Sequence, residues 1–236
     1  MLSGPKPRAS QSRVDAKPGA IVAVTNLKGG AGKTTLSVNV AAALAVKGAA
    51  VILADADAQA TSLAWGAAGH LPMRTEALPI SGEGAKALEA WLGRLVALRR
   101  EAAFLLVDLP PNLGGVTTAA LSLADLALVP VPASGLDIQA TAKALKLIRD
   151  ARDVRQGEKP AALLVPSRVD RRTASGREIE AVLSDFREMV APAVTQRAAH
   201  VDAFGAGQWI GDYARGSAAH VEVEAVAAMV RRIVSR

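Results

Sequence analysis

Short apolar segments alternate with longer segments of helical periodicity along most of the chain. From residue 19 onward, runs such as AIVAV, VILAD, FLLVD and LALVPVP are apolar at nearly every position, whereas the stretches between them repeat apolar residues every three or four positions. Continuous apolar runs are typical of strands covered on both faces, and the longer period is typical of helices. The alternation predicts an α/β fold, with a doubly wound, mostly parallel sheet and helices on both faces.

Turn residues divide this pattern into definite elements. The predicted strands are residues 19–26, 50–55, 76–80, 103–108, 126–132, 160–165 and 190–196. The predicted helices run from the glycine-rich turn after the first strand to about residue 47, and then over residues 59–66, 84–99, 115–124, 136–155, 175–189 and 217–234. Because 236 residues is an ordinary length for one domain and no internal repeat is visible, we expect residues 19–236 to form a single domain.

The composition excludes several kinds of chemistry. The chain has no cysteine, which rules out disulfide scaffolds, thiol catalysis and clusters held by protein thiolates. Its three histidines, His70, His200 and His220, lack the spacing of zinc ligands, so we expect surface or packing roles for them. No apolar run approaches the ~20 residues of a membrane span, and no secretory signal is visible, so we expect a soluble cytoplasmic protein.

Half of the net charge of +6 lies at the start of the chain. Residues 1–20 contain Lys6, Arg8, Arg13 and Lys17 against Asp15. Since this stretch is too polar to fold alone, residues 1–18 are predicted to be a disordered basic tail. Such a tail suits nonspecific contact with nucleic acid or another anionic surface, and it is equally compatible with a solvated leader.

The strongest chemical signal is the glycine-rich turn after the first predicted strand, LKGGAGKTT at residues 27–35. A strand, such a turn and a helix that begins at Gly-Lys-Thr form a phosphate site, because backbone N–H groups and the helix dipole face the anion. In this pattern Lys33 reaches the terminal phosphates and the Thr34 hydroxyl binds Mg²⁺. The residues expected to cradle the phosphates are Gly29, Gly30, Ala31, Gly32, Lys33, Thr34 and Thr35, with Lys28 at the entrance.

The turn departs from the usual P-loop, GxxxxGK[ST], because Leu27 replaces its first glycine and a second lysine, Lys28, follows. The resulting KGGxGKTT resembles the deviant Walker A ATPases, a family that includes the ParA and MinD proteins and the nitrogenase iron protein. The resemblance covers about residues 20–236 and is nearest to small ParA proteins of the ParF type. It implies a P-loop NTPase-like fold, ATP and Mg²⁺ as cofactors, and a homodimer that encloses ATP. Lys28 would then act in trans on the partner's nucleotide, and Lys33 in cis.

Three carboxylates extend the resemblance. Asp55 and Asp57 lie at the end of the second predicted strand, where the family has DxDPQ and this chain has DADAQ, with Ala58 in place of proline. By resemblance Asp57 positions the attacking water, and Asp55 supports the magnesium shell. The strand LLVD ends in Asp108, the Walker B arrangement, which we expect to hold Mg²⁺ through water.

Two later segments also resemble the family. The sequence VPVP at residues 129–132, with Ser134 and Asp137 after it, is similar to the family's VPVxPSxxD stretch. The sequence LVPSR at residues 164–168 lies where the family's strand leads into adenine contacts, so Arg168 is assigned to nucleotide binding by resemblance.

Within the family, the sequence favours an ATP-switched ATPase that binds DNA nonspecifically and drives plasmid partition with a ParB-like partner. The missing cysteines exclude a nitrogenase iron protein, and the last helix is interpreted as covering the sheet, so no membrane partner is expected. A MinD-like or carboxysome-positioning ATPase remains an alternative, as does an ATP-dependent metabolic ligase, which would generally lack Lys28. The candidate DNA contacts are Arg171, Arg172, Arg177, Arg197, Arg215, Arg231, Arg232 and Arg236.

Overall fold

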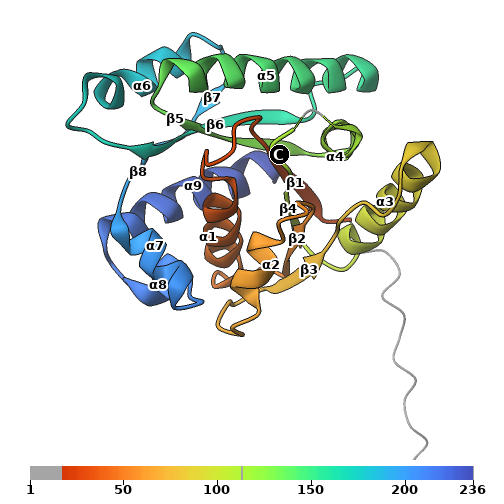
Figure 1. Ribbon diagram of the computed structural model, residues 1–236, viewed down its shortest axis with the longest axis horizontal. Helices are drawn as coiled ribbons and strands as arrows, with labels where there is room; N and C mark the ends of the chain where they lie inside the picture. The colour runs from red at the N-terminus through yellow and green to blue at the C-terminus, as the bar shows by residue number, and fades with distance from the viewer. Residues whose placement is uncertain (1–17, 113, 236) are drawn as a thin grey trace, which may run out of the picture.

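An all-parallel sheet runs through the centre of the protein (Figure 1). The computed structural model describes residues 18–112 and 114–235, so the predicted basic tail lies outside the described residues apart from Pro18, as does Arg236. The strand order is β3-β2-β4-β1-β5-β6-β7, and β8 also pairs with β6. The strands are β1 (Ala20–Val24), β2 (Val51–Asp55), β3 (Arg74–Ala77), β4 (Phe104–Asp108), β5 (Leu126–Pro132), β6 (Ala161–Val169), β7 (Met189–Val190) and β8 (Val194–Thr195).

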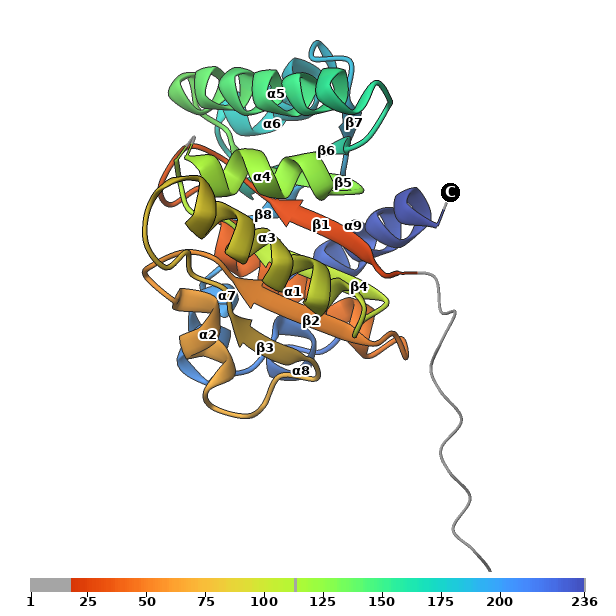
Figure 2. The ribbon, with the colours of Figure 1, turned by 90° about the vertical axis from the view of Figure 1, so that its right-hand side faces the viewer.

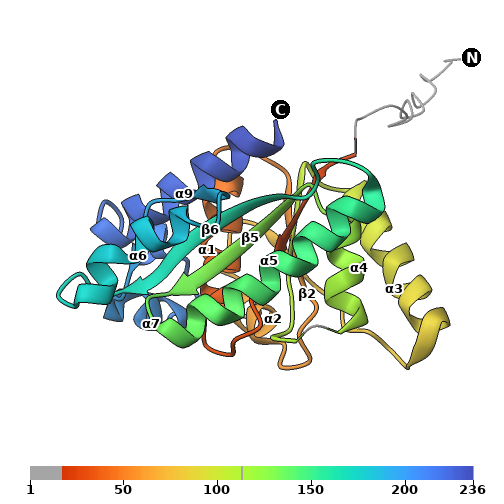
Figure 3. The ribbon, with the colours of Figure 1, turned by 90° about the horizontal axis from the view of Figure 1, so that it is seen from above.

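Helices cover both faces of the sheet, as the apolar strands predict. They are α1 (Lys33–Ala45), α2 (Thr61–Gly66), α3 (Gly84–Arg99), α4 (Gly115–Leu123), α5 (Gly135–Arg155), α6 (Ala174–Ser184), α7 (Ala198–Gly205), α8 (Ile210–Tyr213) and α9 (Ala218–Val234). Figure 1 shows α5 and α6 across the sheet from α1 and α9, and in Figure 2 α3 and α4 lie in front of the strands with α1 behind. Seen from above, α5, α4 and α3 follow one another along one face (Figure 3).

Each central strand contributes to two separate hydrophobic cores. In β1, Ile21 and Ala23 pack into the core under α3, α4, α5 and α6, whereas Val22 and Val24 pack into the core under α1 and α9. All four side chains are fully buried. Because neither face of β1 meets water, an alternating polar pattern would have been incompatible with this position.

The structure confirms the fold class and most of the predicted element positions. The predicted elements after β6 are wrong in their boundaries. The helix predicted at residues 175–189 ends at Ser184, and the strand predicted at residues 190–196 is two short strands, β7 and β8. Pro192 lies between them and has no N–H to donate to a ladder. Similarly, β3 ends at Ala77, before Pro79, instead of covering residues 76–80. The sequence pattern did not predict α7 and α8.

The last helix, α9, packs on the sheet. Its residues Val223, Val226 and Val230 are buried in the core shared with α1. This confirms the interpretation of α9 as a covering helix. Among the described residues, no helix has the length and apolarity needed to cross a membrane.

Candidate active site

The ends of β1, β2 and β4 bring the predicted site residues to one edge of the sheet. In the register of the parallel strands, Asp108 is the Cα partner of Val24 on one side and of Asp55 on the other. The loop after β1 is the glycine-rich turn, and the loop after β2 carries Asp57. The carboxyl edge of an open α/β sheet is where ligands of this fold class bind.

Asn26 holds the start of the glycine-rich turn. Its side-chain Nδ2 donates to the Pro130 carbonyl on β5 at 2.7 Å, and its Oδ1 accepts the Lys28 N–H at 3.1 Å. Further along, Gly30 and Gly32 have positive φ values of 75° and 92°, a region that glycine enters without steric cost. The turn therefore folds back sharply into α1.

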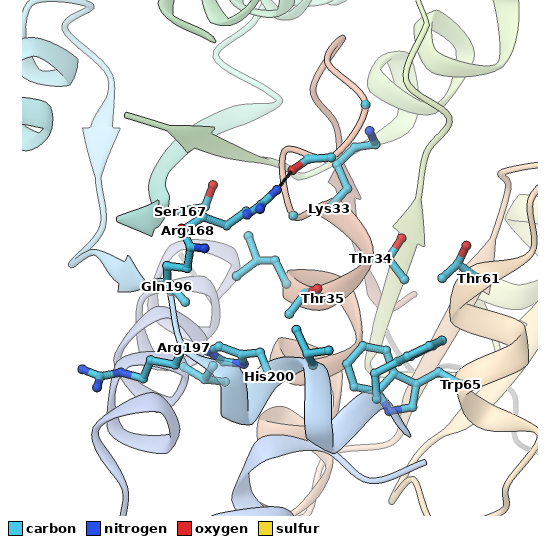
Figure 4. Close-up of a pocket in the computed structure, with 18 of the residues that line it drawn as sticks. Lys33, Thr34, Thr35, Thr61, Trp65, Ser167, Arg168, Gln196, Arg197 and His200 are labelled. Carbon is cyan, nitrogen blue, oxygen red and sulfur yellow. Dashed lines mark hydrogen bonds between the residues drawn. The ribbon is translucent and has the colours of Figure 1, made fainter. Parts of the chain in front are cut away.

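Two side chains at the end of β6 hold the middle of the turn. Ser167 Oγ donates to the Ala31 carbonyl at 2.9 Å, and Arg168 Nη1 donates to the Gly30 carbonyl at 2.8 Å, the bond drawn in Figure 4. Because the C=O and N–H of a trans peptide point in opposite directions, the N–H groups of Ala31 and Gly32 turn away from these two side chains. Ser167 and Arg168 thus hold the middle of the turn through its carbonyl groups.

Lys33 points its amine into the site. The residue is only 7% exposed, and Nζ donates to the Lys28 carbonyl at 3.3 Å. Burial lowers the pKa of Lys33, although the negative charges of Asp108 and Asp57 act in the opposite direction. The buried ammonium of Lys33 can pair with an anionic ligand, and the two neighbouring carboxylates can pair with a cation. The site therefore suits a polyanion that binds together with a metal cation. Lys28, predicted to act in trans, is not among the residues that line the cavity described below.

Asp108 has one buried oxygen that is not used within the described residues. Ser37 Oγ donates to Oδ1 at 3.1 Å, whereas Oδ2 is fully buried and accepts no hydrogen bond there. Burial raises the pKa of Asp108 to about 7, and Asp55 adds to this, while the hydroxyls of Thr34 and Ser37 lower it. An orphaned carboxylate oxygen beside a threonine hydroxyl is an oxygen donor set of the kind that magnesium prefers, so the residues fit the predicted metal.

Asp55 has a positioning role that the sequence did not indicate. Its Oδ1 accepts the Asp57 N–H at 3.1 Å, and its Oδ2 accepts the Leu63 N–H at 2.9 Å. The side chain is 2% exposed, so these bonds form away from solvent. Both oxygens, predicted to support a magnesium shell, therefore already tie the loop after β2 to α2.

Asp57 lies on that loop and lines the cavity. Its Oδ1 accepts the Gln59 N–H at 3.0 Å, and the turn ends at Ala60, which has a positive φ of 51°. Ala58 occupies the position where the resemblance expects proline, and the hydrogen bonds of Asp55 and Asp57 hold the loop there. The structure thus brings Asp57 to the same cavity as Lys33, as the sequence analysis expects.

A cavity of about 790 Å³ extends from the glycine-rich turn to α7 (Figure 4). Its polar end is formed by Gly30, Gly32, Lys33 and Thr34, next to Arg168. Its other end, towards α7, includes the apolar side chains of Leu36, Trp65, Val194, Val201, Phe204 and Val223, together with the polar side chains of Thr195, Gln196, Arg197 and His200. A volume of this size is typical of pockets for small molecules and cofactors.

Sequence reasoning missed the apolar end because it missed α7. Trp65 on α2 and Phe204 on α7 meet edge to face with ring centroids 5.0 Å apart, and Trp65 Nε1 donates to the Gln208 carbonyl at 3.0 Å. His200, also on α7, lines the same cavity. No local motif marks these residues, since they meet only through tertiary packing.

The structure pairs most of the candidate DNA-contacting arginines with neighbours. Arg177 and Arg231 donate to backbone carbonyls, and Arg232 is exposed with no partner among the described residues. Three of the arginines, Arg171, Arg172 and Arg197, line a second cavity of about 460 Å³ beside the first. Four form surface ion pairs with N–O distances between 2.7 and 3.4 Å: Arg171–Glu180, Arg172–Asp170, Arg197–Glu222 and Arg215–Asp212.

Comparisons with known proteins agree with this geometry. A family model described as the CobQ/CobB/MinD/ParA nucleotide binding domain matches residues 22–208. The chain is 31% identical to "Maintenance of carboxysome distribution protein A" of Halothiobacillus neapolitanus, over 69% of this chain and 72% of that protein. It is 28% identical to "Sporulation initiation inhibitor protein Soj" of Bacillus subtilis, over 76% and 85%. The fold is similar to that of Cyanothece McdA in a solved complex with ATP, with a TM-score of 0.74 at 14% identity, over 93% and 98%.

Proposed function

The chain belongs to the CobQ/CobB/MinD/ParA nucleotide-binding family of ATPases, and from this premise we propose that it is an ATP-switched protein that binds DNA without sequence preference and positions a cargo. The observation that carries the proposal is the glycine-rich turn with two lysines, Lys28 and Lys33. It lies at one sheet edge with Asp57 and Asp108.

The residues at the cavity are proposed to have separate roles. Lys33 and the backbone N–H groups of residues 29–35 bind the phosphates, and Arg168 holds the turn while lining the nucleotide cavity. The Thr34 hydroxyl would bind Mg²⁺ directly and Asp108 would hold it through water, and the metal would neutralise charge that develops on the phosphates. Asp57 orients the water that attacks the terminal phosphate, and Asp55 holds Asp57 in place through its backbone.

In this proposal ATP joins two copies of the chain. Lys28 of each copy would reach the nucleotide of the other, which supports the charge of the transition state as an arginine finger does. That role is compatible with the position of Lys28, which does not line the cavity of its own chain. Hydrolysis would then require the dimer and would end it.

The proposed DNA contacts are the surface arginines. An exposed ion pair is worth only about 0–1 kcal/mol, so a DNA phosphate can replace a carboxylate partner at small cost. Arg171, Arg172 and Arg197 gather at the second cavity, and Arg232 is exposed without a partner in the described part of the chain. Binding of this kind would associate the protein with the nucleoid and would weaken steeply with salt.

Plasmid partition with a ParB-like adaptor is the cargo role that the sequence analysis favours. A protein-cluster cargo is the second candidate, because two of the similar proteins, from Halothiobacillus neapolitanus and Gloeobacter kilaueensis, are carboxysome distribution proteins. A small DNA-binding protein encoded next to this chain, beside repeated DNA sequences, would support the plasmid. A neighbouring gene for a shell or scaffold protein would support the cluster.

Gel shifts with DNA of random sequence test the proposal. We expect a shift with ATP and Mg²⁺ at low salt, and its loss with ADP or at moderate salt. Lys33→Ala should abolish nucleotide binding and the shift together, since it removes the buried ammonium. Absence of any ATP-dependent shift with the unchanged chain, under conditions where ATP binding is measured directly, would contradict DNA binding.

A further inference from the structure

Arg197, one of the three arginines at the second cavity, is paired with a carboxylate that is fixed in place. It lies between β8 and α7, on a segment, residues 195–198, that lines both cavities. Its Nη2 donates to Glu222 Oε1 at 3.1 Å, and Figure 4 shows its guanidinium pointing away from the glycine-rich turn. The side chain of Arg197 is 40% exposed and that of Glu222 is 18% exposed. The carboxylate, which comes from α9, is therefore the more buried member of the pair.

Hydrogen bonds to the loop after β8 hold Glu222 in this position. Its Oε2 accepts the Thr195 N–H at 2.9 Å, and Thr195 Oγ1 donates to its Oε1 at 2.9 Å. Thr195 is itself fixed to the sheet, since it is the Cα partner of Val169 on β6. If Glu222 moved away, a partly buried N–H would lose its acceptor, which costs more than a surface ion pair contributes.

Arg171, at the same cavity, is paired with a carboxylate that is able to leave. Its Nη2 donates to Glu180 Oε1 at 2.7 Å, and the two side chains are 47% and 42% exposed. Within the described residues, the Glu180 carboxylate accepts no other hydrogen bond, so its rotation into solvent leaves no polar group unpaired. Arg172 is intermediate, because Asp170 accepts both its side chain and its backbone N–H but is more exposed than Glu222.

A phosphate that enters the second cavity meets these ion pairs differently. At Arg171 the phosphate can replace the carboxylate, whereas at Arg197 the carboxylate stays beside the guanidinium and cancels its charge. A like charge held close to a phosphate also lowers the affinity for it. We propose that Glu222 withholds Arg197 from nucleic acid, and that Arg171 is the arginine that binds a backbone phosphate in the second cavity. This inference rests on the proposed DNA binding.

Two double variants, each of which removes a whole ion pair, test the inference without changing the net charge. Their affinity for DNA of random sequence is measured by fluorescence anisotropy at low salt, with ATP and Mg²⁺. Arg197→Ala combined with Glu222→Gln should change the affinity by less than about twofold, because this pair contributes no net charge. Arg171→Ala combined with Glu180→Gln should weaken binding about tenfold per site, the value of a hydrogen bond between charged groups. It should also reduce the dependence of log affinity on log salt by about one per site.

Single variants that remove one negative charge give an independent measurement. Glu222→Gln keeps an oxygen for the Thr195 N–H but no longer neutralises Arg197, so it should strengthen DNA binding about threefold per site. Glu224→Gln is the matched control, because it removes the same charge from the same helix, and its partner Lys47 does not line the second cavity. It should change the affinity by less than about twofold.

The outcomes separate this inference from the proposed function. Equal losses of affinity in the two double variants, or no loss in the variant that lacks Arg171, would overturn the inference and leave DNA binding intact. A Glu222→Gln variant that binds DNA no more tightly than the Glu224→Gln control would overturn it as well. If the unchanged chain binds ATP but no DNA, the proposed DNA binding fails, and this inference fails with it.

Discussion

Replacing Asp55 with asparagine tests whether this side chain holds the catalytic loop or only supports a metal. In the nucleotide-free protein both carboxylate oxygens accept backbone N–H groups, from Asp57 at 3.1 Å and from Leu63 at 2.9 Å. Asparagine has one oxygen, so Asp55→Asn turns an amide NH₂ towards the second N–H. Loss of a hydrogen bond to a charged acceptor costs about 1.5–3 kcal/mol.

One opposing effect reduces this loss. The charge of Asp55 raises the pKa of Asp108, so its removal relieves a repulsion between neighbouring carboxylates. We therefore expect the free energy of unfolding to fall by about 2 kcal/mol, a large part of the about 5–15 kcal/mol that stabilises a typical protein. Because the loop of Asp57 loses its support, ATP turnover should fall as well.

Urea unfolding in EDTA, without nucleotide, is the decisive assay, since no metal contributes to stability there. Asp57→Asn is the matched control. Its side chain is partly exposed and accepts a single N–H from Gln59, so its unfolding free energy should change by less than about 1 kcal/mol. Unchanged stability of Asp55→Asn in EDTA, combined with weaker Mg²⁺-dependent nucleotide binding, would refute the positioning role.

Three other predictions concern single residues. Asp57→Ala should still bind ATP but lose turnover, so a single-turnover assay that shows the unchanged rate would contradict its role. Arg168→Ala removes the bond to the Gly30 carbonyl and should weaken ATP binding about three- to tenfold in calorimetry, whereas unchanged affinity would contradict its part in the cradle. Burial raises the pKa of Asp125, but hydrogen bonds from Lys159 and Ile21 and the charge of Arg99 outweigh it, so the net pKa lies below 3.8. The stability that Asp125 adds should be complete above pH 3.8 and disappear as the pH falls through the lower folded-state pKa; acid unfolding of Asp125→Asn should lack this component.

The phosphate end of the site could be predicted because its signals are local. A strand, a glycine-rich turn and a helix are contiguous in residues 20–45, so the geometry around Lys33 follows from short-range rules. Asp55 and Asp108 are far apart in the chain, but each ends a buried strand. Parallel strands bring such ends to one edge, and the observed register makes these two residues Cα partners.

The other end of the site could not be predicted because its residues meet only in the folded chain. The helix α7 is short, and its sequence AAHVDAFG has no marked apolar period; Ala203 is buried and Phe204 rests on Trp65 from a helix far away in sequence. The two buried ring nitrogens of His200, which have no hydrogen-bond partner among the described residues, also depend on these tertiary contacts. A sequence pattern records where a polar residue occurs, but it does not record whether that residue finds a partner.

The central claim is that an active site is complete only when Lys28 comes from a second copy of the chain. The direct measurement is ATP turnover by Lys28→Ala, by Asp57→Ala and by their equimolar mixture. Each variant alone should be inactive. In a mixed dimer, the Lys28→Ala subunit keeps its own Asp57 and receives Lys28 from its partner, so one of the two sites is complete.

Since about half of the dimers in the mixture are mixed and each has one complete site, turnover should recover to at most about a quarter of the unchanged rate. The recovery should depend on protein concentration, as dimer formation does. A mixture no more active than the sum of its two components would contradict the account, because it would mean that Lys28 serves only its own nucleotide.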